Sequence, residues 1–155
     1  MRLYLVQHGD ALPADVDPAR PLSPAGRSDV ERVAAFMEAA GERVEQVWQS
    51  GKLRAEQTAE LLAATVAPGV LPEARSGLNP NDAVEPLAVE AVKWTRDTML
   101  VGHLPFMARL ADRLVTGQED TGLVAFRPGS VLCLERSDED HWTIVWMIRP
   151  ELLPG

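Results

Sequence analysis

Short, continuously apolar segments alternate with longer helical segments along this chain of 155 residues, and this alternation limits the possible fold more than any other feature. Residues 3–6 and 99–101 are apolar without interruption, which is typical of strands buried on both faces of a sheet. We expect a helix over 22–41 and a second helix over 52–66, between these two strands. Strands that alternate with helices predict an α/β fold in which helices cover both faces of the sheet.

The remaining segments complete a three-layer α/β/α sandwich. Residues 130–149 resemble two strands around a polar turn, so the mostly parallel sheet should be a mixed sheet with a C-terminal antiparallel hairpin. No repeat or linker interrupts the pattern, and we expect one domain spanning 1–155. We expect two further strands, over 44–50 and 70–74, and two further helices, over 83–93 and 104–115.

The first helix carries its own boundary signals. Ser23 can cap its amino end, Pro24 suits its first turn, and Gly41 can end it. Its apolar residues recur at helical spacing and form one face toward the core.

Composition excludes several classes of function. The chain is 46% apolar and 25% charged, which is typical of a globular protein. A net charge of −8 argues against nucleic acid or an anionic membrane surface as the main partner. Cys133 is the one cysteine and lies in an apolar run, so we expect a buried thiol and no internal disulfide. No signal peptide or span of membrane length is visible, so a cytoplasmic monomer is the expectation.

Polar residues gather where the predicted strands end. Ligands of open α/β sheets bind beyond the carboxyl ends of the strands. The first strand ends at Gln7-His8-Gly9, and a later buried strand ends at Gly102-His103. The strand at 44–50 ends at Ser50, and the helix that follows it carries Arg54. Two of the three histidines and a basic helix start are therefore predicted at one edge of the sheet.

These motifs together resemble the histidine phosphatase superfamily, and in particular its SixA-type phosphohistidine phosphatase branch. The shared stretches are His-Gly-Asp-Ala, Arg-Pro-Leu-Ser, Leu-Arg-Ala-Glu-Gln-Thr and His-Leu-Pro. Their order and spacing match the family over nearly the whole chain. The four shared stretches begin at His8, Arg20, Leu53 and His103.

The resemblance implies a role for each matching residue. His8 would be the nucleophile that becomes phosphorylated, because a neutral imidazole is nucleophilic near pH 7. His103 and Arg54 would bind the phosphoryl group, and Arg20 would add a contact from the loop. No metal or other cofactor is implied, because arginine and histidine carry the charge.

Two further residues are candidates for the phosphate site. Gly9 is expected to let the chain turn sharply, so that the preceding histidine points into the pocket. Ser50 is either a phosphate ligand or the cap of the helix that follows it.

Gln7 departs from the family pattern, which usually has an arginine at this position. Glutamine is neutral, and a hydrogen bond to a charged group contributes roughly 1.5–3 kcal/mol. We therefore expect catalysis to be slower by ~10- to 100-fold unless another donor compensates. Lys52 and Arg75 are the candidates for that compensation.

A general acid is also missing from its usual place. Relatives that hydrolyse phosphate esters need an acid to protonate the leaving oxygen, and some carry it directly after the second histidine. Leu104 stands there in this chain, and Glu73 and Asp10 are the remaining candidates. Imidazole leaves more easily than an alkoxide, so the missing acid favours a phosphohistidine substrate.

Three hypotheses follow. The first is a phosphatase that removes phosphate from phosphohistidine on a protein, such as a phosphotransfer domain, through a covalent phospho-His8 intermediate. The second is a small-molecule phosphomonoesterase on the same fold, with Glu73 as its acid. The third is a weak or inactive relative that binds phosphate or a phosphoprotein, because Gln7 replaces the arginine.

Overall fold

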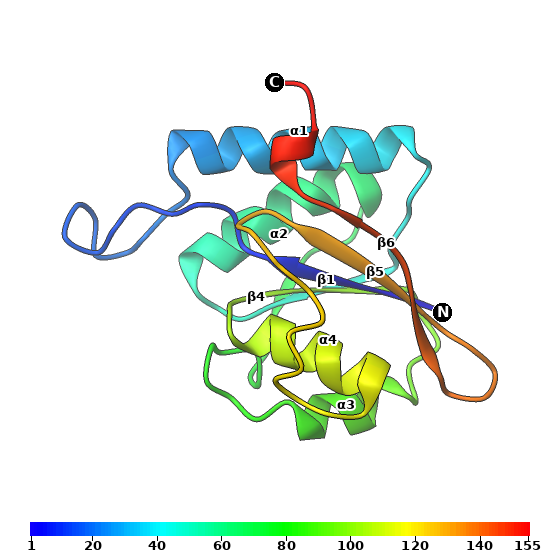
Figure 1. Cartoon of the computed structure of the whole chain (residues 1–155). Coiled ribbons are helices and arrows are strands. Elements are labelled where there is room, and N and C mark those ends of the chain that lie inside the picture. Colours follow the sequence, from blue (N-terminus) through cyan, green and yellow to red (C-terminus); the bar gives the residue numbers. More distant parts are fainter.

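A computed structural model describes all 155 residues and confirms the predicted α/β/α sandwich (Figure 1). Six strands form one mixed sheet in the order β3-β2-β4-β1-β5-β6. The first four elements are β1 (Arg2–Gln7), α1 (Pro24–Ala39), β2 (Gln46–Gln49) and α2 (Leu53–Val66). They are followed by β3 (Glu73–Ala74), α3 (Glu85–Ala91), β4 (Thr98–Gly102), α4 (Phe106–Thr116), β5 (Val131–Arg136), β6 (Trp142–Ile148) and the 3-10 turn η1 (Pro150–Leu152).

The central strand β1 separates two hydrophobic cores. Tyr4 and Val6 face the core beneath α1 and α2, whereas Leu3 and Leu5 face the core beneath α3 and α4. Successive side chains of a strand point to opposite faces, so a strand covered on both sides must be apolar throughout. Figure 1 shows the two helix pairs on either side of the sheet. The layering explains the uninterrupted apolar run at the start of the chain.

Helix α1 has the boundaries that its sequence predicts. The Ser23 hydroxyl accepts a hydrogen bond from the Gly26 amide at 2.9 Å, and Pro24 is the first helical residue. Gly41 follows the last turn with φ = 77°, the left-handed conformation that glycine adopts without strain. The expected strand at 44–50 is shorter in the structure, because only Gln46–Gln49 pairs as β2.

The C-terminal hairpin confirms the predicted antiparallel edge of the sheet. Strand β5 pairs antiparallel with both β1 and β6. Cys133 lies on β5 opposite Tyr4 and is fully buried, as expected for a structural thiol. None of the helices has the length and hydropathy that crossing a membrane would require.

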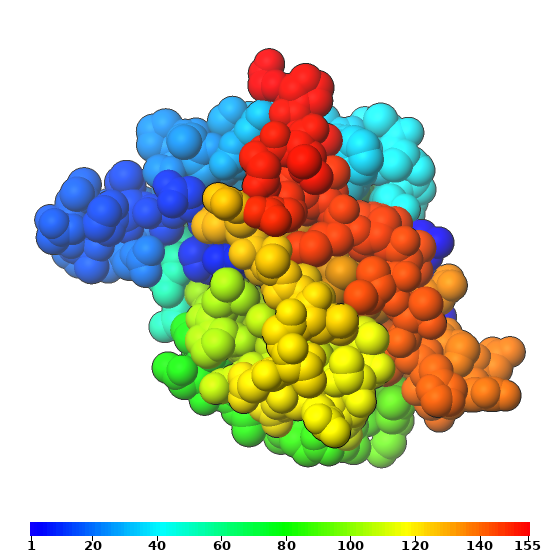
Figure 2. Space-filling view, in the orientation of Figure 1, coloured from blue at the N-terminus to red at the C-terminus, as the bar shows by residue number.

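The parallel strands β1, β2 and β4 end together at one edge of the sheet. Gln7 pairs with Gly102, and Gln49 pairs with Val101. The His8 amide continues this pairing by donating to the Gly102 carbonyl at 3.0 Å. A loop over residues 10–22 projects from this edge, as Figures 1 and 2 show in blue, and an Ala11–Leu22 bridge closes its base. The residues that follow each strand are therefore neighbours in space.

Candidate active site

The two histidines that follow β1 and β4 lie against each other. The ring centroids of His8 and His103 are 4.9 Å apart, and the ring planes are inclined by 53°. His103 is only 2% exposed, whereas His8 is half-buried. The structure thus brings together the pair that the sequence predicts at this edge.

The hydrogen bonding of His8 determines which ring nitrogen can react. Its Nδ1 lies 2.7 Å from the Gly9 carbonyl oxygen, which can only accept a hydrogen bond. Nδ1 therefore carries the proton of the neutral ring, and Nε2 carries a free lone pair. Burial lowers the pKa of His8, and the charges of Arg54 and Arg20 lower it further. His8 is consequently neutral at pH 7 and can act as a nucleophile through Nε2.

His103 is held in a more strongly perturbed environment. Burial lowers its pKa to about 3, helped by the neighbouring His8 and by the Arg54 and Lys52 charges. Its Nε2 forms a 2.7 Å hydrogen bond with the Ser50 hydroxyl, while its Nδ1 is buried without a partner.

The lowered pKa of His103 should make the free energy of unfolding depend on pH. The unfolded chain binds a proton at His103 near pH 6.5, whereas the folded protein does so only near pH 3. The free energy of unfolding should therefore fall as the pH drops below 6.5, by about 2 kcal/mol between pH 7.5 and pH 5. Urea unfolding across this range measures the loss. His103→Asn should show a clearly shallower fall, and an unchanged slope would contradict the assigned environment.

Three cations surround the histidine pair, and none of them forms an ion pair. Burial and the charge of Arg20 lower the pKa of Arg54, which lies in the first turn of α2. Lys52 precedes that turn and acts on the same histidine as the two arginines. Unpaired cations of this kind are costly to gather unless an anion joins them. The cluster therefore has the electrostatics of an anion site.

Arg20 is held in a strained backbone conformation. Its φ of 49° lies in the left-handed region, which costs a non-glycine residue roughly 1–2 kcal/mol. Its Nε donates to the Leu12 carbonyl oxygen at 3.1 Å, and its amide donates to the Asp17 carbonyl oxygen at 3.0 Å. These bonds hold the side chain at the base of the projecting loop.

Buried polar atoms without partners also concentrate here. The protein contains five such side-chain atoms, and three belong to candidate site residues: Gln7 Oε1, Arg54 Nε and His103 Nδ1. Such atoms are rare in folded proteins, and each requires an explanation. A polar ligand bound beside His8 would supply partners for Arg54 Nε and His103 Nδ1.

Thr58 and Gln57 of α2, which the sequence did not single out, connect the segments that form the site. The Thr58 hydroxyl accepts from the Gly9 amide at 2.9 Å and donates to the Arg54 carbonyl at 2.7 Å. The Gln57 side-chain oxygen accepts from the Leu22 amide at 2.8 Å. Their positions three and four residues after Arg54 place them on the same face of α2, which is the signal that could have identified them.

The structure corrects the reason for glycine at position 9. Gly9 does not have a positive φ, so the turn itself does not require it. A Cβ atom there would lie 2.8 Å from a methyl carbon of Val30 and 3.1 Å from one of Leu22. The residue is small because α1 packs against it. Its amide already donates to Thr58, so no free amide supports the prediction that Gly9 binds phosphate.

Ser50 is not the cap of α2, so that alternative is wrong. The cap position is Lys52, and no side chain bonds to the helix end there. The Ser50 hydroxyl instead accepts from the Lys52 amide at 3.3 Å and bonds to His103.

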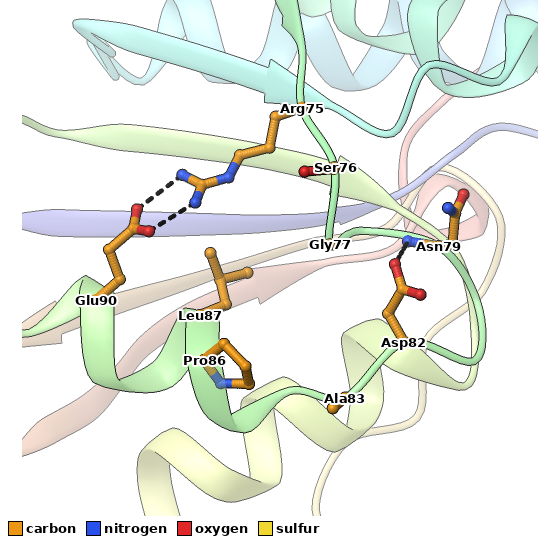
Figure 3. A pocket seen from close by; sticks show the side chains of 9 residues that line it. All are labelled: Arg75, Ser76, Gly77, Asn79, Asp82, Ala83, Pro86, Leu87 and Glu90. Atoms are coloured by element: carbon orange, nitrogen blue, oxygen red, sulfur yellow. Dashed lines mark hydrogen bonds and ion pairs between the residues drawn. The ribbon is translucent and has the colours of Figure 1, made fainter.

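Arg75 is committed elsewhere. Its guanidinium donates to both carboxylate oxygens of Glu90, at 2.7 and 2.8 Å, and lies 4.5 Å from the Trp48 ring centroid. Figure 3 shows this pair at one end of a hollow of about 510 Å³, formed by residues between 75 and 90. Of the two candidates to compensate for Gln7, only Lys52 lies beside the histidines.

The candidate acids differ in position. Glu73 lies exposed on the edge strand β3, where it pairs with Trp48 and lines a separate hollow with Glu45 and Arg96. Its charge is not among those that act on His8 or His103. Asp10 lies close enough to His8 for its charge to act on that ring, and its carboxylate accepts from the Ser23 hydroxyl at 2.7 Å. No three His, Cys, Asp or Glu side chains are grouped as metal ligands would be.

Known proteins were compared with this chain by sequence and by structure. No protein-family model matches the chain. An uncharacterised protein of Picosynechococcus is 30% identical over 96% of this chain and 99% of its own length. The phosphohistidine phosphatase SixA of Escherichia coli is 26% identical over 97% of this chain and 94% of that protein.

Solved structures extend the comparison. The protein histidine phosphatase SixA complexed with tungstate superposes with a TM-score of 0.85 and 25% identity, covering 98% of this chain and 99% of that one. The α-ribazole phosphatase of Shigella flexneri has the same fold, with a TM-score of 0.78 and 15% identity over 97% of each chain.

The chain therefore belongs to the histidine phosphatase superfamily. Within that superfamily it is similar to the SixA phosphohistidine phosphatases over nearly its whole length.

Proposed function

We propose that this protein is a phosphohistidine phosphatase that acts on a phosphorylated histidine of another protein. In the first step, His8 Nε2 attacks the phosphorus atom, and the bond from phosphorus to the substrate imidazole breaks. The substrate imidazole keeps the proton on its other ring nitrogen and leaves as a neutral ring, with the electron pair of the broken phosphorus–nitrogen bond. Water then attacks phospho-His8, which releases inorganic phosphate and restores the neutral ring.

One observation carries this proposal, namely the free Nε2 lone pair of a neutral His8 beside unpaired cations. The bond from Nδ1 to the Gly9 carbonyl orients that lone pair. Arg54 and Arg20 supply positive charge where a transferred phosphoryl group would place negative charge on its oxygens. Tungstate is a tetrahedral oxyanion like phosphate, so its presence in the related SixA structure fits this role.

The positions of the carboxylates favour phosphohistidine over a phosphate ester. Transfer from one imidazole to another exchanges two similar phosphorus–nitrogen bonds, so it needs little help from an acid. An ester would need a proton donor at its leaving oxygen. Leu104 follows His103, and Glu73 lies exposed on the edge strand β3, where its charge does not act on either histidine.

A second candidate function rests on Asp10. This carboxylate lies beside His8 and could donate a proton to an alkoxide, as a small-molecule phosphomonoesterase requires. The α-ribazole phosphatase shows that the fold also occurs with such an activity. The Asp10 carboxylate already accepts a hydrogen bond from the Ser23 hydroxyl at 2.7 Å, so it is engaged at the start of α1.

Phosphate release from two substrates separates these functions. The protein is incubated with a phosphohistidine-bearing phosphotransfer domain and, in parallel, with p-nitrophenyl phosphate. Rapid release from phosphohistidine with little from the ester is the expected result. Strong ester hydrolysis would favour the monoesterase. Tight binding of inorganic phosphate without any release would identify a binding protein.

Gln7→Arg should raise the rate of phosphohistidine hydrolysis by ~10- to 100-fold. Gln7 is the last residue of β1 and directly precedes His8, so an arginine here would add a charged donor at the edge of the sheet that carries the anion site. Steady-state kinetics of phosphate release measure the gain. Gln118→Arg adds the same charge on the exposed surface and should leave the rate unchanged. An unchanged rate in Gln7→Arg would mean that another donor already fills this place.

A further inference from the structure

We infer that Ser50 is a positioning residue that holds His103 in the tautomer with its proton on Nδ1, so that His103 offers a hydrogen-bond donor to the group on His8. The identity of that group as a phosphoryl rests on the proposed function. The tautomer itself does not, because it follows from contacts within the protein.

The contacts of the Ser50 hydroxyl leave one arrangement in which all of its groups are satisfied. A hydroxyl has one proton and two lone pairs. The Lys52 amide donates to one lone pair at 3.3 Å, and the only other partner is His103 Nε2 at 2.7 Å. If Nε2 were the donor, the hydroxyl proton would have no acceptor in the protein. If the hydroxyl is the donor, its proton bonds to Nε2, all three groups of the hydroxyl are used or free to solvent, and the one proton without an acceptor is that of His103 Nδ1.

The charge state of His103 makes this choice consequential. Burial and the surrounding charges of Arg54, Lys52 and Arg20 keep the ring neutral at pH 7. A neutral imidazole carries one proton on one of two nitrogens. A proton from Ser50 at Nε2 therefore places the ring's own proton on Nδ1.

Nδ1 is the atom of His103 that is left for another partner. It is buried and has no acceptor in the protein, although the ring lies against that of His8. A buried N–H without an acceptor is unfavourable, and an anionic oxygen would relieve it. The opposite tautomer would present a lone pair and repel the same oxygen. Ser50 thus determines whether His103 attracts or repels a group transferred to His8.

The two rings then have complementary roles that their neighbours set. The Gly9 carbonyl places the proton of His8 on Nδ1 and leaves Nε2 free to attack. The Ser50 hydroxyl places the proton of His103 on Nδ1 and provides a donor for the phosphoryl oxygens. His8 supplies the nucleophile, and His103 stabilises the negative charge of the phosphoryl group that His8 receives.

Nitrogen NMR of the resting protein tests the tautomer directly. Histidine is labelled with ¹⁵N, and the three rings are assigned with His8→Ala and His141→Gln. At pH 7.5 the His103 Nδ1 is expected to be protonated and Nε2 unprotonated. Inorganic phosphate should shift the Nδ1 resonance. A proton on Nε2 in the wild type would overturn the inference, whatever the protein hydrolyses.

Variants of Ser50 connect the tautomer to turnover. In Ser50→Ala, His103 should no longer be held in one tautomer, and kcat should fall about tenfold. Ser50→Thr keeps the hydroxyl, so it should retain both the Nδ1-protonated tautomer of His103 and the wild-type kcat. Ser28→Ala removes an exposed hydroxyl from α1 and serves as the matched control. An unchanged tautomer in Ser50→Ala would overturn the assigned role. Absence of phosphohistidine hydrolysis by the wild type, with the expected spectrum, would instead overturn only the proposed function.

Discussion

His8→Ala is expected to abolish phosphate release, with a fall in kcat of roughly 10⁴-fold or more. The substitution removes the free Nε2 that forms the covalent intermediate. The His103 ring cannot replace it, because its Nε2 is already hydrogen-bonded to Ser50 and its Nδ1 is buried. Phosphate release from the phosphohistidine protein measures the loss.

The covalent intermediate provides a second readout for this prediction. Wild-type protein quenched during turnover should carry one phosphoryl group on His8, detectable by mass spectrometry under alkaline conditions that preserve phosphohistidine. His8→Ala should carry none. His141→Ala is the control, because this third histidine lies exposed in the β5–β6 turn and should not affect activity. Normal turnover by His8→Ala would refute the mechanism.

Arg54→Gln is expected to lower kcat/KM by roughly 10²- to 10³-fold. A guanidinium matches the oxygens of a phosphoryl group with paired donors, and glutamine keeps only a neutral amide. Gln7 is neutral and adds no charge to the site, so each of the arginines beside His8 should matter more. Steady-state kinetics with phosphohistidine substrate measure the effect.

Stability separates this catalytic loss from unfolding. Arg54 forms no ion pair, and burial and the Arg20 charge disfavour its protonated form, so Arg54→Gln should leave the free energy of unfolding unchanged or slightly increased. Arg27→Gln removes an exposed arginine of α1 that pairs with Glu31 at 3.6 Å, and it should leave kcat/KM unchanged. A loss below about tenfold in Arg54→Gln would contradict a phosphate-binding role.

Much of this molecule follows from its sequence alone. A strand with an apolar residue at every position, such as residues 3–6, must be covered on both faces, and the intervening helices supply the cover. Parallel strands joined by helices end at one edge, so His8 and His103 had to meet there. These conclusions depend on periodicity and chain direction, which are local properties of the sequence.

Other features were decided only by the tertiary structure. Arg75 and Glu73 are charged residues of one short segment, yet the first pairs with Glu90 and the second lines an exposed hollow with Glu45 and Arg96. Gly9 is required by the close approach of Val30 rather than by its own turn. Ser50 bonds to His103, 53 residues away, instead of capping the adjacent helix. Sequence spacing places a side chain on a face or at a strand end, but its partner depends on which distant segments pack beside it.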